Sequence, residues 1–132
     1  MHPRWARAPT ARATAGESSF DVVVARSERL RLLGFMGIDE EDFVPLLFPR
    51  CRSIHTYWMK APIDVVWLEL GDDGAEVIAT ASEIEARRRV KAPKARRETA
   101  RRSVAALELP AGMAGELELS EGDRLALAPA HA

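Results

Sequence analysis

Short apolar runs separated by turn residues recur along the chain and predict a mostly-β domain. The runs are rich in Val, Ile, Leu and aromatic residues, which favour buried strands over exposed loops. Most of them stop at Gly, Pro or Asp, the residues that begin turns. The expected strands are residues 20–25, 46–48 (a strand or a buried loop), 54–60 and 63–70 (two strands, or one interrupted at Pro62), 75–79, 104–109 and 124–128.

Two short helices complete the expected elements. Ser27 followed by Glu28 fits a helix start, and Leu30 and Leu33 then recur at helical spacing. Gly34 limits this helix to about two turns. A second short helix is expected within residues 111–119, weakened by two glycines. The pattern predicts a compact α+β domain, mostly β, with a β-barrel or sandwich-like sheet and two short helices.

A length of 132 residues fits one domain. Residues 1–17 are rich in Arg and Ala, contain Pro3 and Pro9, and are expected to be a disordered tail. The domain is expected at 18–128, with a second tail at 129–132. No stretch has the apolar length of a membrane span or a secretory signal, and one cysteine excludes an internal disulfide. These features predict a cytoplasmic protein.

Residues 53–65 are the densest part of the sequence and read SIHTYWMKAPIDV. This segment resembles the central signature of a bacterial and archaeal family called domain of unknown function 192. Residues 107–112 (LELPAG), 121–125 (EGDRL) and 28–37 (ERLRLLGFMG) are similar to further motifs of that family, in the same order. Ile38 stands where the family has an arginine. The resemblance covers residues 20–128 and implies a compact, mostly-β domain with no established activity.

Four residues around the bend at Pro62 are candidate ligand-binding residues: His55, Trp58, Lys60 and Asp64. In a regular strand, Trp58 and Lys60 lie on one face and His55 on the other. A cleft with Trp58 as its floor suits a small anionic or planar ligand. In the alternative reading the same residues are structural: Asp64 braces the neighbouring backbone, Lys60 pairs with it, and Trp58 belongs to the core.

Catalysis finds little support in the sequence, and no catalytic residue is predicted. His55 and Asp64 suit a base and its orienting acid, but no serine or cysteine lies in a nucleophile turn such as GxSxG. Cys51 precedes His55 by four positions, about 13 Å along an extended strand and too far for a hydrogen bond. Cys51 therefore reads as a small buried hydrophobe.

No metal or cofactor is predicted either. His2 and His131 lie in the expected tails, which leaves one histidine and one cysteine where a structural zinc site needs four ligands. The acidic cluster at residues 39–42 lacks the spacing of a calcium loop. It reads as a solvated surface or the first turn of a helix.

The formal net charge of −1 conceals a strongly basic stretch at residues 85–102, which holds nine basic and two acidic residues. Its cations could bind the phosphates of RNA or DNA, or an anionic lipid surface. The stretch contains no aromatic residue for base stacking, and a basic surface loop is the plainer reading. The candidate basic patch consists of Arg87, Arg88, Arg89, Lys91, Lys94, Arg96, Arg97, Arg101 and Arg102.

The leading functional hypothesis is a non-catalytic binding or accessory module for an unknown small molecule or protein. An adaptor for RNA or an anionic surface through residues 87–102 is the alternative, and an undiscovered hydrolase is the third hypothesis.

Overall fold

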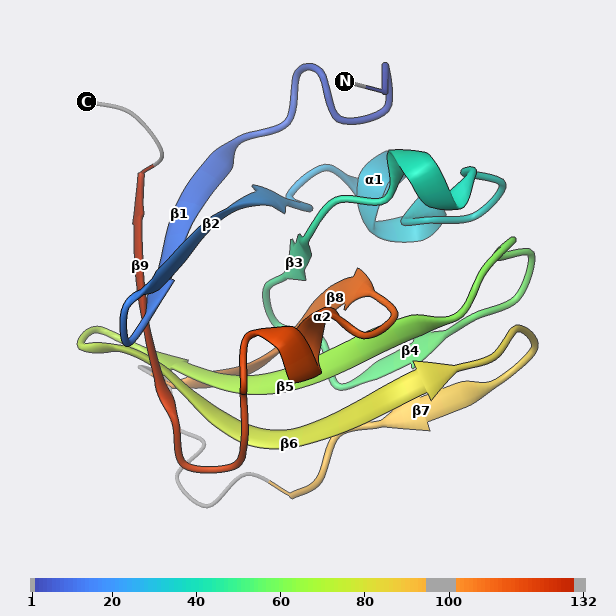
Figure 1. Cartoon of the computed structure of the whole chain (residues 1–132). Coiled ribbons are helices and arrows are strands. Elements are labelled where there is room, and N and C mark those ends of the chain that lie inside the picture. The colour runs from blue at the N-terminus through green and yellow to red at the C-terminus, as the bar shows by residue number, and fades with distance from the viewer. Residues whose placement is uncertain (1, 95–101, 130–132) are drawn as a thin grey trace.

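The computed structural model describes residues 2–94 and 102–129. These residues form short strands and three single-turn or two-turn helical segments (Figure 1). The elements in chain order are β1 Thr10–Ala15, β2 Ser18–Val24, α1 Glu28–Leu33, the 3-10 turn η1 Glu40–Asp42, β3 Leu46–Phe48, β4 Ser53–His55, β5 Ile63–Gly71, β6 Gly74–Ile84, β7 Arg89–Lys91, β8 Ser103–Pro110, α2 Met113–Glu116 and β9 Arg124–Pro129.

The main sheet closes into a barrel in the order β1-β2-β3-β8-β5-β6-β9. Pairing between β1 and β9 closes the barrel, and β2 with β3 is its parallel pair. The strands β4 and β7 pair with each other in a separate two-stranded ribbon, which Figure 1 shows at the edge of the barrel. The mostly-β prediction with a barrel-like sheet and two short helices is confirmed.

Alternation along the strands separates two apolar cores on the two faces of the sheet. All seven barrel strands contribute to one core, which therefore fills the interior; Val66 and Leu68 of β5 and Leu107 of β8 belong to it. The other core lies on the outer face of β2, β3, β5 and β8. The N-terminal segment, α1, the residues on either side of η1 and the β4–β7 ribbon cover it, which keeps this apolar face away from water.

Helix α1 begins and ends where the sequence predicts. The Ser27 side-chain oxygen accepts a hydrogen bond from the amide of Leu30 at 3.1 Å, so it caps the first turn. Gly34 ends the helix with a φ of 46°, and its amide donates to the carbonyl of Leu30 at 2.8 Å. Leu30 is the buried residue that anchors this short helix to the outer core.

The prediction of a disordered tail over residues 1–17 is wrong for the described residues 2–17. Residues 10–15 form β1, without which the barrel has no closing strand. Upstream, Trp5 is only 1% exposed, and its indole N–H donates to the main-chain carbonyl of Asp42 at 3.0 Å. Arg4 donates to the carbonyls of Gly34 and Met36. Long-range pairing and these contacts order a segment that has weak local β-propensity.

The expected strand over residues 54–60 is also wrong beyond His55. The chain turns at residues 56–59, where the amide of Met59 donates to the carbonyl of Thr56 and Trp58 has a φ of 61°. Thr56 fixes this turn to the loop before β7: its hydroxyl donates to the carbonyl of Glu85 at 2.6 Å and accepts from the amide of Arg88 at 2.9 Å. A buried threonine with tertiary partners overrides the local strand preference.

Asp64 ties three elements together at one end of the barrel. Its side chain is fully buried on the inner face of β5, and its two carboxylate oxygens accept three backbone N–H groups. The donors are Glu83 at 2.8 Å, where the pairing of β6 with β5 shifts register, and Gly112 and Ala114 at 3.0 Å, at the start of α2. Asp64 therefore supplies the N-terminal cap that Gly112 has no side chain to provide.

Among the described residues, no helix combines the length and the apolar character that a membrane crossing requires.

Replacing Asp64 should destabilise the fold strongly. Asp64→Ala leaves three buried donors unpaired, and Asp64→Asn places an NH₂ group against at least one of them. We expect either variant to lose about 3 kcal/mol of unfolding free energy in urea denaturation. The control Asp21→Asn, which removes an exposed ion pair to Arg12, should lose less than about 1 kcal/mol. Equal losses in Asp64→Asn and Asp21→Asn would contradict this role.

Candidate functional site

A small cleft of about 90 Å³ lies between the C-terminal end of α1 and β4, on the covered outer face of the barrel. It can hold a chemical group of a few heavy atoms. Apolar side chains form most of its wall, and polar groups enter it from β4, from the loop before β4, from β8 and from α1, whose Arg31 guanidinium donates to the carbonyls of Pro49 and Arg50. Its lining includes Leu32, Leu33, Phe48, Cys51, Ile54, His55, Met59 and Glu108.

Glu108 is the unusual member of this lining. It is 2% exposed, and among the described residues its Oε1 atom has no hydrogen-bond partner. On β8 it lies opposite Leu46 of β3 and Val65 of β5, so its neighbours across the sheet are apolar. Burial raises the pKa of Glu108 to about 8, and the carboxyl group is therefore mostly protonated at neutral pH. A protonated carboxyl offers one O–H donor and an acceptor to anything that enters the cleft.

Cys51 and His55 both line the cleft but do not form a nucleophile pair. The Cys51 thiol donates to the carbonyl of Ser53 at 3.3 Å, and His55 Nδ1 accepts from the amide of Tyr57 at 3.3 Å. Burial raises the pKa of the Cys51 thiol, and Glu108 adds to this once it is ionised, while the Ser53 contact and Arg31 partly offset it. The thiol form, which is a poor nucleophile, is therefore favoured.

Exposed apolar side chains surround this region on both sides. On the β4 side, the rings of His55, Tyr57 and Trp58 form a cluster in which the ring centroids lie 5.5 to 6.5 Å apart. Trp58 is 71% exposed and Tyr57 39%. On the α1 side, Leu32 is 70% exposed and lines the cleft itself. These three are the exposed large hydrophobic residues of the described chain, and they gather around one site.

The structure separates the four residues that the sequence grouped as a ligand site. His55 lines the cleft, and Trp58 lies beside it in the aromatic cluster. Lys60 is exposed and pairs with Asp39 at 3.0 Å instead of with Asp64. Asp64 is buried on the opposite face of the sheet with both oxygens occupied, so the structure does not bring it together with His55 and Trp58, and its contacts match the alternative of a backbone brace.

The family model of domain of unknown function 192 (DUF192), described as an uncharacterized ACR, matches residues 10–127. The chain belongs to the DUF192 family. No curated protein matches it. Two crystal structures have a similar fold, each with a TM-score of 0.63. One is a suggested transcription regulator from Sinorhizobium meliloti 1021, 19% identical over 90% of this chain and 92% of that one. The other is a protein of unknown function from Novosphingobium aromaticivorans DSM 12444, 18% identical over 95% and 96%.

Two of the four DUF192-like motifs meet at the Asp64 brace. Asp64 belongs to the PIDV part of the first motif. Of the amides that donate to it, that of Gly112 ends the LELPAG motif and that of Ala114 follows it. Glu108 lies in the same LELPAG segment but points to the other face of the sheet. In this DUF192 chain, one motif therefore contributes both to the brace and to the cleft.

The predicted basic patch is present only in part. Arg87, Arg88, Arg89, Lys91 and Lys94 are exposed. Arg102 is half-buried and pairs with Glu69 at 3.3 Å and Asp73 at 3.6 Å, so it stabilises the barrel instead of extending the patch. Arg96, Arg97 and Arg101 lie outside the described residues.

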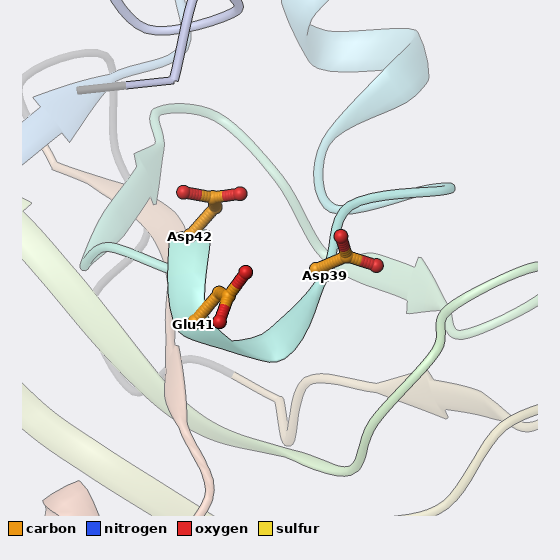
Figure 2. A group of neighbouring side chains, drawn as sticks. All are labelled: Asp39, Glu41 and Asp42. Atoms are coloured by element: carbon orange, nitrogen blue, oxygen red, sulfur yellow. The ribbon is translucent and has the colours of Figure 1, made fainter.

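Figure 2 shows the acidic cluster of Asp39, Glu41 and Asp42 along η1. Their carboxylate oxygens lie within 4.8 Å of one another. Asp39 and Glu41 are exposed, and Asp39 is already paired with Lys60. The cluster therefore has the features of a solvated acidic surface, as the sequence predicts.

Glu108→Gln should flatten the dependence of stability on pH. In the unfolded chain this carboxyl ionises above about pH 4.5, whereas in the folded chain it stays protonated until about pH 8. Unfolding between these values releases a proton, so the unfolding free energy should fall by up to about 1.4 kcal/mol per pH unit and level off above pH 8. Urea denaturation from pH 5 to 9 measures this slope.

In Glu108→Gln we expect most of that slope to be lost. The exposed control Glu17→Gln should retain the wild-type profile. A wild-type slope that persists in Glu108→Gln would refute the raised pKa.

Proposed function

We propose that the chain is a non-catalytic binding module whose small-molecule ligand places a polar group against Glu108. The observation that carries this proposal is the Oε1 atom of Glu108, which has no hydrogen-bond partner within residues 2–94 and 102–129. More than nine in ten buried polar groups in proteins have a hydrogen-bond partner, and an unpaired one costs about 1 to 3 kcal/mol. A ligand group that hydrogen-bonds to Oε1 would remove that cost, and the free energy gained in this way would favour binding.

The chemistry of the cleft favours a planar ligand over an anionic one. A protonated carboxyl pairs best with a group that both donates and accepts, such as an amide, a urea or a heteroaromatic ring with an N–H beside a ring nitrogen. An anion would instead oppose any ionised fraction of Glu108. The cleft admits only part of such a ligand, and Leu32 and the His55 ring are placed to contact the remainder.

The contacts of the two reactive groups in the cleft, the Cys51 thiol and the His55 ring, support binding without catalysis. Cys51 is held as a thiol by burial, and His55 Nδ1 already accepts from the turn backbone. A hydrolase built on His55 and Asp64 has no support from their positions, because Asp64 is fully buried on the inner face of β5. The free thiol of Cys51 supports a cytoplasmic location, which we propose for this protein.

The test is a screen of planar heteroaromatic amides and ureas against the whole protein by ligand-observed NMR. We expect hits whose affinity falls at least tenfold in Glu108→Leu, because leucine fills similar volume without a polar group. Lys60→Ala, which changes an exposed residue outside the cleft, is the matched control and should retain affinity. The proposal fails if no fragment binds wild-type protein at millimolar concentration, or if fragments bind folded Glu108→Leu equally well.

A further inference from the structure

The β4–β7 ribbon has one buried face and one exposed face. Its register places Ser53 opposite Lys91, Ile54 opposite Val90, and His55 opposite Arg89. Ile54 is buried in the outer core and Val90 packs against it. Because side chains alternate along a strand, Arg89 and Lys91 belong to the other face of the ribbon, which is turned away from the barrel, whereas His55, opposite Arg89, also lines the Glu108 cleft.

The aromatic turn at residues 56–59 is fastened to the basic segment that precedes β7. The amide of Thr56 donates to the carbonyl of Arg88 at 2.9 Å, and the amide of Arg87 donates to the carbonyl of Thr56 at 3.3 Å. The amide of Arg88 also reaches the Thr56 hydroxyl at 2.9 Å. Tyr57 and Trp58 are therefore held next to arginines that follow about thirty residues later in the sequence.

The cations of this face are available for a partner. Arg87, Arg88, Arg89 and Lys91 are exposed, and within residues 2–94 and 102–129 none of them forms an ion pair. The acidic residues closest in sequence are Glu83 and Glu85, both exposed, so cations outnumber acids here. Lys60 and Arg102, by contrast, are already paired with carboxylates.

We propose that the exposed face of the β4–β7 ribbon, together with the Tyr57–Trp58 turn, binds single-stranded nucleic acid. In this arrangement Arg89 and Lys91 contact phosphates, and the Trp58 ring stacks on an unpaired base. Single strands are favoured over duplex because stacking on a side chain requires a base that is not already stacked and paired. This surface adjoins the Glu108 cleft through His55, which lines the cleft and contacts both aromatic rings, whereas Tyr57 and Trp58 do not line it.

Nucleic acid also fits this face better than a membrane does. A membrane-binding surface needs a continuous apolar area that enters the headgroup region. Here the exposed rings belong to a turn that is hydrogen-bonded to the arginine segment before β7, and the Trp58 side chain is 71% exposed. Cations interleaved with exposed rings are the features that single-strand binders combine.

The experiment measures binding of the full chain to fluorescein-labelled U12 and dT12 by anisotropy, between 50 and 200 mM salt. We expect Trp58→Ala to weaken binding about tenfold or more, and Trp58→Phe to restore most of it. Arg89→Ala with Lys91→Ala should make the log–log salt slope shallower by about 1.4, the value for two lost phosphate contacts. Arg12→Ala with Arg124→Ala removes two cations that are already paired elsewhere and should leave the slope unchanged.

Tryptophan emission gives a second readout, because Trp5 and Trp67 are 1% and 2% exposed whereas Trp58 is 71% exposed. Addition of U12 should quench the emission of wild-type protein but not that of Trp58→Ala. Three results would overturn the proposal: unchanged affinity in both Trp58→Ala and the Arg89/Lys91 double variant, equal affinity for a 12-base-pair duplex, or binding to phosphatidylserine vesicles without binding to either oligonucleotide.

Discussion

The buried carboxylate of Asp64 is the interaction on which the rest of this fold depends. It joins β5 to the irregular end of β6 and to the first turn of α2, three segments that have no other common contact of this kind among the described residues. At Glu83 the β6 backbone has a φ of 51°, and β6 ends at the next residue. From there the chain reaches β7, which pairs with β4. Fixing the end of β6 therefore also fixes the ribbon and the aromatic turn that Thr56 attaches to it.

Two buried acidic side chains on adjacent strands differ in the face they occupy and in their hydrogen bonding. Asp64 and Glu108 lie one register step apart on β5 and β8, but they point to opposite faces of the sheet. Asp64 faces the inner core with three hydrogen bonds, whereas Glu108 faces the outer core with one oxygen that has no partner in the described part of the chain. A buried carboxylate with all its hydrogen bonds made has a structural role. A buried carboxyl with an unpaired oxygen beside a cleft can gain a hydrogen bond from a ligand, which is why we place the proposed ligand site at Glu108.

The sequence predicts elements well where the local pattern is strong. The β-branched runs of β2, β5 and β8 and the Ser27 cap of α1 form as expected. Prediction from the sequence fails where partners distant in the chain determine the local structure. Strand β1 is ordered by β2 and β9, and residues 56–59 turn because Thr56 binds Arg88. One signal for the cleft was present, since Glu108 is the only charged residue in the apolar run 104–109. No sequence signal places Tyr57 and Trp58 beside the basic stretch, because only tertiary contacts bring them together.

Whether Glu108 is a neutral carboxyl in the cleft can be measured at that group itself. The ¹³C chemical shift of the Glu108 side-chain carboxyl, assigned by comparison with Glu108→Gln, should be followed from pH 4 to 10 in the folded protein. We expect a midpoint near 8. A midpoint near the ordinary value of 4.5 would show an ionised, solvated or paired carboxylate at neutral pH and would contradict the proposed site.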